Sequence, residues 1–270
     1  MSAAASAPVL VHRDTDELAG ATAARLVARL AQAQSLRGSA SVVLTGGRNG
    51  NALLAALATA EGRDAVDFSR LDVWWGDERF LPEGDPERNV TQAREAVLDA
   101  LPLDAARVHP MAPSDGTYGD DASAAAKAYA AELAAAGAEE AGAEQARPEG
   151  ARAEEAGAGA VPAFDVLLLG VGPDTHVASL FPGHPAVAET ERHVVAVHNA
   201  PKPPPVRISL TLPAIRTARE VWLLAAGEDK ADAVSRALSG QFGPEEAPAC
   251  GAYGTERTLW LLDEAAAKLP

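Results

Sequence analysis

The stretch of sequence that decides the fold is Phe164–Gly183, which reads FDVLLLGVGPDTHVASLFPG. Its apolar run, Val166–Leu169, has the length of a buried strand and stops at Gly170. A glycine turn follows, then Asp174 and His176, and then an apolar stretch that predicts a short helix. In an open α/β sheet, ligands bind where strands end and helices begin. This stretch therefore places a carboxylate and a proton-transfer group where a ligand site is expected.

The rest of the chain alternates between two kinds of segment. Apolar, partly β-branched runs predict strands at Val42–Leu44, Leu71–Trp75, Val166–Leu169, Val194–Val197 and Val221–Ala225. Ala- and Leu-rich segments with helical spacing predict helices at Glu17–Gln34, Asn51–Ala60, Thr91–Ala100, Ser123–Ala135 and Asp229–Leu238. This alternation predicts an α/β fold, a mainly parallel twisted sheet of Rossmann-like type with helices on both faces.

One segment breaks the pattern. From about residue 134 to residue 160 the chain consists of Ala, Glu, Gly, Gln, Arg and Pro. Because it has no bulky apolar residue to anchor a core, we expect a disordered surface insertion. Strand and helix patterns flank it, which favours a single domain over residues 1–270; a linker between two domains is the alternative.

The composition limits the classes of partner. A formal net charge of −15 opposes binding to nucleic acid or to an anionic membrane, although a local cluster of Arg and Lys can still bind an anionic small molecule. The single cysteine, Cys250, excludes an intrachain disulfide and a cysteine-based zinc site. The N-terminal residues lack the features of a secretory signal and no run reaches membrane-spanning length, so we expect a cytoplasmic protein.

A second glycine turn, with Thr45, Gly46 and Gly47, follows the strand that ends at Leu44. Glycine lets the backbone approach a ligand closely, and the helix N-terminus that follows offers free N–H groups, a combination suited to phosphate. The motif is neither a Walker loop nor a dinucleotide-binding Gly-x-Gly-x-x-Gly. An ordinary tight turn is the alternative, and Arg48 either adds charge to a phosphate site or points to solvent.

Charged residues also occur at other strand ends and in a stiff loop. Asp77 and Arg79 directly follow a predicted strand, Arg207 follows a proline-rich loop, and Lys230 follows the last predicted strand. Arginine suits bidentate phosphate binding, and a lysine in the first turn of a helix, where the dipole disfavours it, can be retained to bind an anion. Solvated side chains are the alternative, and for Glu78 we expect a solvated ion pair.

Asp174 and His176 have the side chains of general base catalysis. An unperturbed histidine titrates near neutrality, so much of it is able to accept a proton at cellular pH. If Asp174 caps the following turn, His176 lies in the first turn of a helix, whose dipole favours the neutral ring. A simple N-cap beside a satisfied polar residue is the alternative. No suitably spaced His or Cys ligands accompany the pair, so we predict no metal site.

Five motifs in order resemble the 6-phosphogluconolactonase family of the glucosamine/galactosamine-6-phosphate isomerase superfamily. They are Thr45-Gly46-Gly47, Trp75-Gly76-Asp77-Glu78-Arg79, Gly172-Pro173-Asp174-Thr175-His176, Pro205-Val206-Arg207-Ile208-Ser209 and Gly227-Glu228-Asp229-Lys230-Ala231. The resemblance spans roughly Val9 to Leu262 without the Ala- and Glu-rich segment. Two positions depart from the family pattern: Arg48-Asn49 replaces a polar pair with hydroxyls, and Thr175 replaces a glycine, so the local turn is expected to differ slightly.

The resemblance implies hydrolysis of 6-phospho-D-glucono-1,5-lactone to 6-phosphogluconate in the oxidative pentose phosphate pathway, with no cofactor. It implies that His176 activates water, that Asp174 orients the imidazole or a substrate hydroxyl, and that Asp77 holds a hydroxyl. The oxyanion donors are either backbone N–H groups near Gly172 or a cation. Arg79 is implied to bind the phosphate or the sugar acid, and Arg207 to contact the substrate, while for Lys202 the question stays open. The predicted contacts with the substrate or its phosphate are Thr45, Gly46, Gly47, Arg48, Arg79, Arg207 and Lys230.

Two other functions stay open at this point. A glucosamine-6-phosphate deaminase/isomerase needs a glutamate five residues after the histidine, where this chain has Phe181. A sugar-phosphate-binding relative without catalysis is the second alternative. As partners we expect a small sugar phosphate lactone, no nucleic acid and no membrane, with the chain a monomer or a weak homo-oligomer.

Overall fold

The computed structural model describes residues 7–145 and 161–268. Within these ranges the main sheet has six parallel strands in the order β1-β9-β8-β5-β2-β3, and a second sheet has three antiparallel strands in the order β4-β7-β6. The strands of the main sheet are β1 Val9–His12, β9 Arg257–Asp263, β8 Glu220–Ala225, β5 Val166–Gly170, β2 Ala40–Leu44 and β3 Leu71–Trp75. Those of the small sheet are β4 Asp77–Arg79, β7 Arg207–Leu210 and β6 Val194–Val197.

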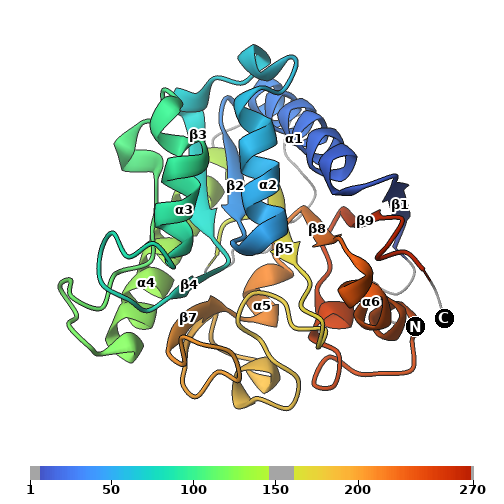
Figure 1. Cartoon of the computed structure of the whole chain (residues 1–270). Coiled ribbons are helices and arrows are strands. Elements are labelled where there is room, and N and C mark those ends of the chain that lie inside the picture. The colour runs from blue at the N-terminus through green and yellow to red at the C-terminus, as the bar shows by residue number, and fades with distance from the viewer. Residues whose placement is uncertain (1–6, 146–160, 269–270) are drawn as a thin grey trace.

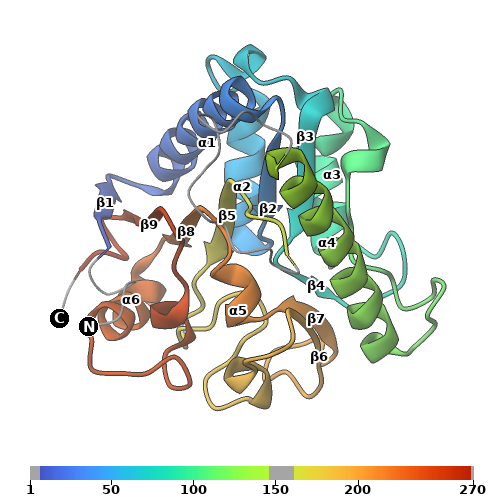
Figure 2. The same cartoon turned by 180° about the vertical axis from the view of Figure 1, so that it is seen from behind.

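Helices cover both faces of the main sheet (Figures 1 and 2). One face carries α1 Thr15–Arg37, α2 Gly47–Ala58 and α3 Asn89–Ala96. The other carries α4 Ala122–Gln145, α5 Leu212–Ile215 and α6 Ala231–Leu238. Among the described residues, no helix combines the length and the apolar character needed to cross a bilayer.

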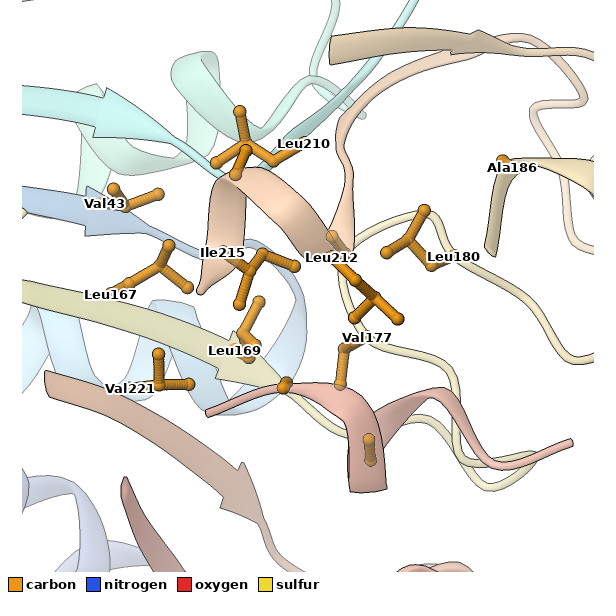
Figure 3. Packing of buried hydrophobic residues seen from close by; sticks show 14 of the residues in the cluster. Val43, Leu167, Leu169, Val177, Leu180, Ala186, Leu210, Leu212, Ile215 and Val221 are labelled. Carbon is orange, nitrogen blue, oxygen red and sulfur yellow. The ribbon is translucent and has the colours of Figure 1, made fainter. Parts of the chain in front are cut away.

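In the strands of the main sheet other than the edge strand β1, neighbouring residues belong to two different cores. Val43 and Leu167 pack on the side of α4 and α5, while Val42 and Leu168 pack on the side of α1 and α2. Figure 3 shows the first of these cores, where Val43 and Leu167 point toward Ile215 of α5. Side chains alternate along a strand, so a sheet covered on both faces needs apolar residues at every position. This is why the predicted strands read as continuous apolar runs.

The predicted α/β architecture is confirmed, with one strand assigned to a different sheet. The bounds of β3 and of Val194–Val197 are as predicted, but the latter segment is β6 of the small antiparallel sheet. Strands β1, β4, β7 and β9 were not predicted. In the edge strand β1, Val9 and Val11 are 41% and 50% exposed, so it has no buried run to reveal it.

The first part of the segment expected to be disordered is helical. Helix α4 continues to Gln145, with Leu133 fully buried and Ala136 packed against the core. Glu140 accepts a hydrogen bond from the Ala163 N–H at 2.8 Å and pairs with Arg219 at 3.3 Å. Alanine has the highest helix propensity and needs little room, so a helix can continue without bulky anchors. Residues 146–160 of that prediction lie outside the described residues.

The strand order reverses between β2 and β5. From β2 the chain moves outward to β3, then crosses to β5 on the opposite side and continues to β8 and β9. The two strands pair only through Val42 and Val43, and beyond that the Thr45 hydroxyl accepts the Gly170 N–H at 3.1 Å. Such a reversal opens a crevice at the carboxyl ends of the strands, where ligands bind in open α/β sheets.

Candidate active site

A cavity of about 340 Å³ lies at this crevice. All of the predicted site residues except Asp174 line it: Thr45, Gly46, Gly47, Arg48, Asp77, Arg79, His176, Arg207 and Lys230. They come from the turn before α2, from β4 and β7, from the loop after β5 and from the segment before α6. Asp174 is not one of the lining residues, but it contacts His176, which is. The fold therefore brings together residues from five separate motifs.

The turn after β2 presents the N-terminus of α2 to the cavity. Gly46 is the N-cap and Gly47 has a φ of +78°, a conformation that glycine adopts without strain. Among the described residues no side chain caps this N-terminus, and its first turn contains no acidic residue. Its backbone N–H groups and positive dipole end are therefore available to an anion.

Two cations, Arg48 and Lys230, line the cavity together with this turn. Arg48 donates to the Ala226 carbonyl at 3.0 Å and lies 3.4 Å from Asp229, so it joins the α2 turn to the loop after β8, although its side chain is 66% exposed. Lys230 Nζ lies 3.6 Å from Asp229. Burial, with the charges of Lys202 and Arg48, lowers the pKa of Lys230 despite Asp229. A bound anion would relieve this crowding of positive charge.

Pairing of β4 with β7 places two arginines side by side. Arg79 is the register partner of Arg207, and Asp77 is that of Ser209, so all four side chains share one face of the small sheet. Arg207 is 5% exposed and donates to the carbonyls of Lys202, Pro203 and Pro204 at 3.0–3.1 Å, which orders the proline-rich loop. Its burial, with the charge of Arg79 and against that of Asp77, lowers the pKa of Arg207.

The expectation of a solvated ion pair at Glu78 is wrong. Glu78 is 1% exposed and lies 3.7 Å from the buried Arg88 guanidinium. Its carboxylate accepts the backbone N–H groups of Arg79, Asn89 and Val90 at 2.6–2.9 Å. Burial raises the pKa of Glu78 to about 7, although these bonds and Arg88 act in the opposite direction. The side chain joins β4 to the first turn of α3, a contact that a local charge pattern does not reveal.

His176 is oriented by a carboxylate. Its Nδ1 atom lies 2.5 Å from Asp174 Oδ1, and Lys202 Nζ lies 3.1 Å from the same oxygen and 3.4 Å from Nδ1. Burial acts to raise the pKa of Asp174, but the hydrogen bonds and charges of His176 and Lys202 outweigh it and hold that pKa well below its ordinary value. The carboxylate is therefore ionised and accepts Nδ1–H, so that in the neutral ring the lone pair is on Nε2.

The helix predicted after His176 does not form in the structure of residues 177–184. Val177 and Leu180 make an isolated β-bridge instead. Asp174 is therefore not an N-cap and no helix dipole acts on His176. The Gly172 N–H donates to the His176 carbonyl and the Thr175 N–H to the Gly172 carbonyl, both at 2.9 Å. Apolar residues here fit a buried turn as well as a helix, because all of them pack into the core.

Thr175 has a left-handed backbone conformation. Its φ is +71°, a left-handed value uncommon for residues with a Cβ. The physical reason given for a changed turn, that a threonine avoids a positive φ, is therefore wrong at this position. Thr175 is 1% exposed and its carbonyl accepts the Ala249 N–H at 3.0 Å, so packing holds a conformation that the residue disfavours.

Comparisons with known proteins show the family of the chain. Residues 13–260 match the family described as glucosamine-6-phosphate isomerases/6-phosphogluconolactonase. The chain belongs to this family. A 6-phosphogluconolactonase of Streptomyces coelicolor is 67% identical over 259 residues, which is 96% of this chain and 93% of that protein. One of Mycobacterium tuberculosis is 48% identical over 98% of this chain and 99% of its own. The solved 6-phosphogluconolactonase of Trypanosoma brucei has a TM-score of 0.75 at 28% identity, with 97% of each chain covered.

In this member of the glucosamine-6-phosphate isomerase/6-phosphogluconolactonase family, several lining residues had no part in the predictions. Asn49, Asn89 and Asp229 line the cavity, and so does Lys202, which the sequence analysis left open. Asn49 and Asn89 each have a buried side-chain oxygen without a hydrogen-bond partner in the described part of the chain. Asn89 stands shortly after the Asp-Glu-Arg run, but nothing local distinguishes it from an ordinary helix start.

The cavity lining of this family member holds few potential metal ligands close together. Across residues 7–145 and 161–268, no cluster of three or more His, Cys, Asp and Glu side chains is placed to hold a metal ion. The acidic lining residues are instead paired with cations or hydroxyls. Asp77 accepts the Ser179 hydroxyl at 2.6 Å, and Asp229 is close to Arg48 and Lys230.

Proposed function

We propose that the chain hydrolyses 6-phospho-D-glucono-1,5-lactone to 6-phospho-D-gluconate, with His176 as the general base. One observation carries this proposal: a histidine oriented by a carboxylate shares a single cavity with a helix N-terminus and a group of cations. The 67% identical relative is named for this activity, which supports the same substrate class. The reaction belongs to the oxidative pentose phosphate pathway.

The phosphate of the substrate binds at the α2 turn. Backbone N–H groups of Gly46 and Gly47 lie beside Thr45, and the helix dipole favours an anion there. Arg79, Arg207 and Lys230 supply positive charge from the other walls of the cavity. These cations form a local positive site in a chain with a net charge of −15, so the overall charge does not prevent binding of an anionic sugar.

The lactone carbonyl faces His176. Nε2 takes a proton from water as the water oxygen bonds to C1, and Asp174 stabilises the imidazolium that forms. The tetrahedral intermediate then collapses, the bond from C1 to the ring oxygen breaks, and the imidazolium returns its proton to that oxygen. The product is the open-chain acid, and His176 is neutral again.

Of the two donors considered for the developing oxyanion, backbone N–H groups near Gly172 or a cation, the geometry favours a cation. The Gly172 N–H is bonded to the His176 carbonyl and the Val171 N–H to the Leu224 carbonyl, so neither is free to bind substrate. Lys202 lines the cavity within 3.4 Å of His176 and is 39% exposed. Its ammonium group is therefore a cation beside the imidazole, in the lining of the same cavity, and can stabilise negative charge there.

The aromatic residue after the histidine opposes the deaminase alternative. Phe181 stands where a deaminase needs its glutamate, and its ring lies 4.6 Å from the His176 ring. It is 1% exposed and also lies beneath the Arg207 guanidinium, at 5.7 Å. An apolar wall therefore occupies the place of the acid that ring opening requires.

The test is hydrolysis of freshly prepared 6-phosphogluconolactone, followed through NADP reduction by added 6-phosphogluconate dehydrogenase. Because the lactone also opens spontaneously, wild type is compared with His176→Ala and with no enzyme. We expect a loss of roughly 100-fold or more in His176→Ala. His184→Ala is the matched control, since His184 bonds the His198 carbonyl and lies outside the cavity lining. A wild-type rate equal to the spontaneous rate would refute the function, and an active His176→Ala variant would refute the assignment of the base.

A further inference from the structure

The side-chain amide of Asn89 has an orientation that its neighbours determine. Its Nδ2 atom lies 2.8 Å from the Asp77 carbonyl oxygen and 3.3 Å from Asp77 Oδ1. Both partners are acceptors, so the amide nitrogen must face Asp77 and the amide oxygen must face away. Asp77 is itself held by the Ser179 hydroxyl at 2.6 Å, so this arrangement is anchored at both ends.

The oxygen that faces away is a buried acceptor without a donor. Asn89 is 3% exposed and lines the cavity, and no donor in the described part of the chain reaches Oδ1. A buried polar atom without a partner is costly, and such atoms are rare in folded proteins. Because Asn89 lines the cavity, a hydrogen-bond donor of the substrate can supply the partner that Oδ1 lacks.

The position of this oxygen narrows the choice of donor. A Cβ atom on Gly46 would lie 1.9 Å from Asn89 Oδ1, so the oxygen lies directly against the turn proposed to bind phosphate. A phosphate dianion has no donor and would repel an amide oxygen. Oδ1 therefore marks the edge of the phosphate site, where the hydroxyls of the sugar begin.

We propose that Asn89 Oδ1 accepts a hydrogen bond from the C4 hydroxyl of the lactone and makes the enzyme selective for a hydroxyl at that carbon. The inference rests on the proposed function, in which the C6 phosphate lies at the α2 turn and C1 faces His176. C5 carries the ring oxygen of a 1,5-lactone, so the free hydroxyl nearest the phosphate is the one on C4. Asn89 is thus a specificity residue at the boundary between the two halves of the site.

The test compares 6-phosphogluconolactone with its 4-deoxy and 2-deoxy analogues, each rate being divided by the spontaneous rate of the same lactone. In wild type we expect kcat/KM to fall roughly 10- to 100-fold for the 4-deoxy lactone, because the buried oxygen then loses its donor. In Asn89→Ala the parent and 4-deoxy lactones should become equal. The ratio of parent to 2-deoxy lactone should stay at its wild-type value.

Ser179→Ala is the matched control for a merely structural role. It removes another hydrogen bond to Asp77 but leaves Asn89 Oδ1 in place, so it should slow all three lactones alike. If Asn89→Ala also slows them alike, the selectivity proposal is wrong. If wild type hydrolyses the 4-deoxy lactone with the same kcat/KM as the parent lactone, the selectivity proposal is also wrong. This comparison needs no variant, so the test does not depend on whether Asn89→Ala folds.

A binding experiment separates this proposal from the proposed function. Calorimetry with 6-phosphogluconate and 4-deoxy-6-phosphogluconate needs no turnover, and wild type should bind the first roughly 10- to 100-fold more tightly. Selective binding without lactone hydrolysis would keep the subsite and refute the activity. Hydrolysis together with equal binding of the two acids would keep the activity and refute the subsite.

Discussion

At the scale of single residues, the site depends on one close approach between a glycine and the His176–Asp174 pair. A Cβ atom on Gly172 would lie 1.9 Å from His176 Nδ1 and 2.6 Å from Asp174 Oδ1. Both distances are far below any van der Waals contact, and the Gly172 N–H also closes the turn by bonding the His176 carbonyl. A side chain at position 172 would therefore displace the imidazole or the carboxylate, so the site requires glycine there as well as His176 and Asp174.

We predict that Gly172→Ala lowers kcat for 6-phosphogluconolactone by roughly 100-fold, because displacement of a catalytic group by about 1 Å costs that much. Thermal unfolding should show that the variant still folds. Gly76→Ala is the control: its Cβ would meet its nearest neighbour, the Leu44 carbonyl, at an ordinary 3.6 Å. Wild-type kcat in Gly172→Ala would mean that the turn opens freely and does not position His176.

At the scale of elements, β4 and α3 are joined through one buried charge pair. Glu78 accepts N–H groups from both elements, and Arg88, just before α3, lies 3.7 Å from it and donates to the Met111 carbonyl. This junction holds Arg79 and Asn89, which both line the cavity. The strand–helix junction thus supports residues of the phosphate half and of the hydroxyl half of the proposed site.

We predict that Arg88→Leu destabilises the fold by about 3–5 kcal/mol, since it leaves a buried carboxylate without its cation. The folded state then binds a proton at Glu78 more tightly than the unfolded state, whose value is near 4.5. The free energy of unfolding falls as the pH rises from the pKa of Glu78 in the unfolded state to its higher pKa in the folded state. The loss caused by Arg88→Leu should therefore be larger at pH 8 than at pH 5. Urea unfolding at both values measures it, with the exposed Arg94→Ala on α3 as control. A loss independent of pH would contradict ionisation of Glu78 as the cause.

At the scale of the whole molecule, the cavity exists because two sheets meet at a reversal of strand order. The main sheet contributes the turns after β2, β5 and β8, and the small antiparallel sheet contributes the side chains of β4 and β7. Lys230 and Gly47 reach the same cavity although 183 residues separate them along the chain. The proposed phosphate site is therefore a property of the complete fold.

We predict that Lys230→Met raises KM for 6-phosphogluconolactone by roughly 10- to 100-fold, the usual effect of losing a hydrogen bond to a charged group. Hydrolysis of D-glucono-1,5-lactone, which lacks the phosphate, should change little. Lys268→Met is the control, because that lysine is 65% exposed and pairs only loosely with Glu228 at 3.9 Å. Equal losses on both lactones would assign Lys230 to the structure of the loop and not to the phosphate.

The sequence by itself determined the features that depend on neighbours along the chain. Continuous apolar runs predicted β2, β3, β5 and β8, because a sheet covered on both faces needs such runs. Glycine turns after these runs, with polar residues beside them, predicted many of the residues that line the cavity. The family motifs then connected these turns to one kind of chemistry.

Only the tertiary structure decided what depends on distant partners. Pairing of β4 with β7 brings Arg79 beside Arg207, and burial between β4 and α3 makes Glu78 a buried partner of Arg88. Packing also holds Thr175 at a positive φ. Local sequence cannot reveal these features, because the same charged run fits solvent or core and the same apolar stretch fits a helix or a buried turn. The free energy that chooses between them comes from contacts with segments far away in the chain.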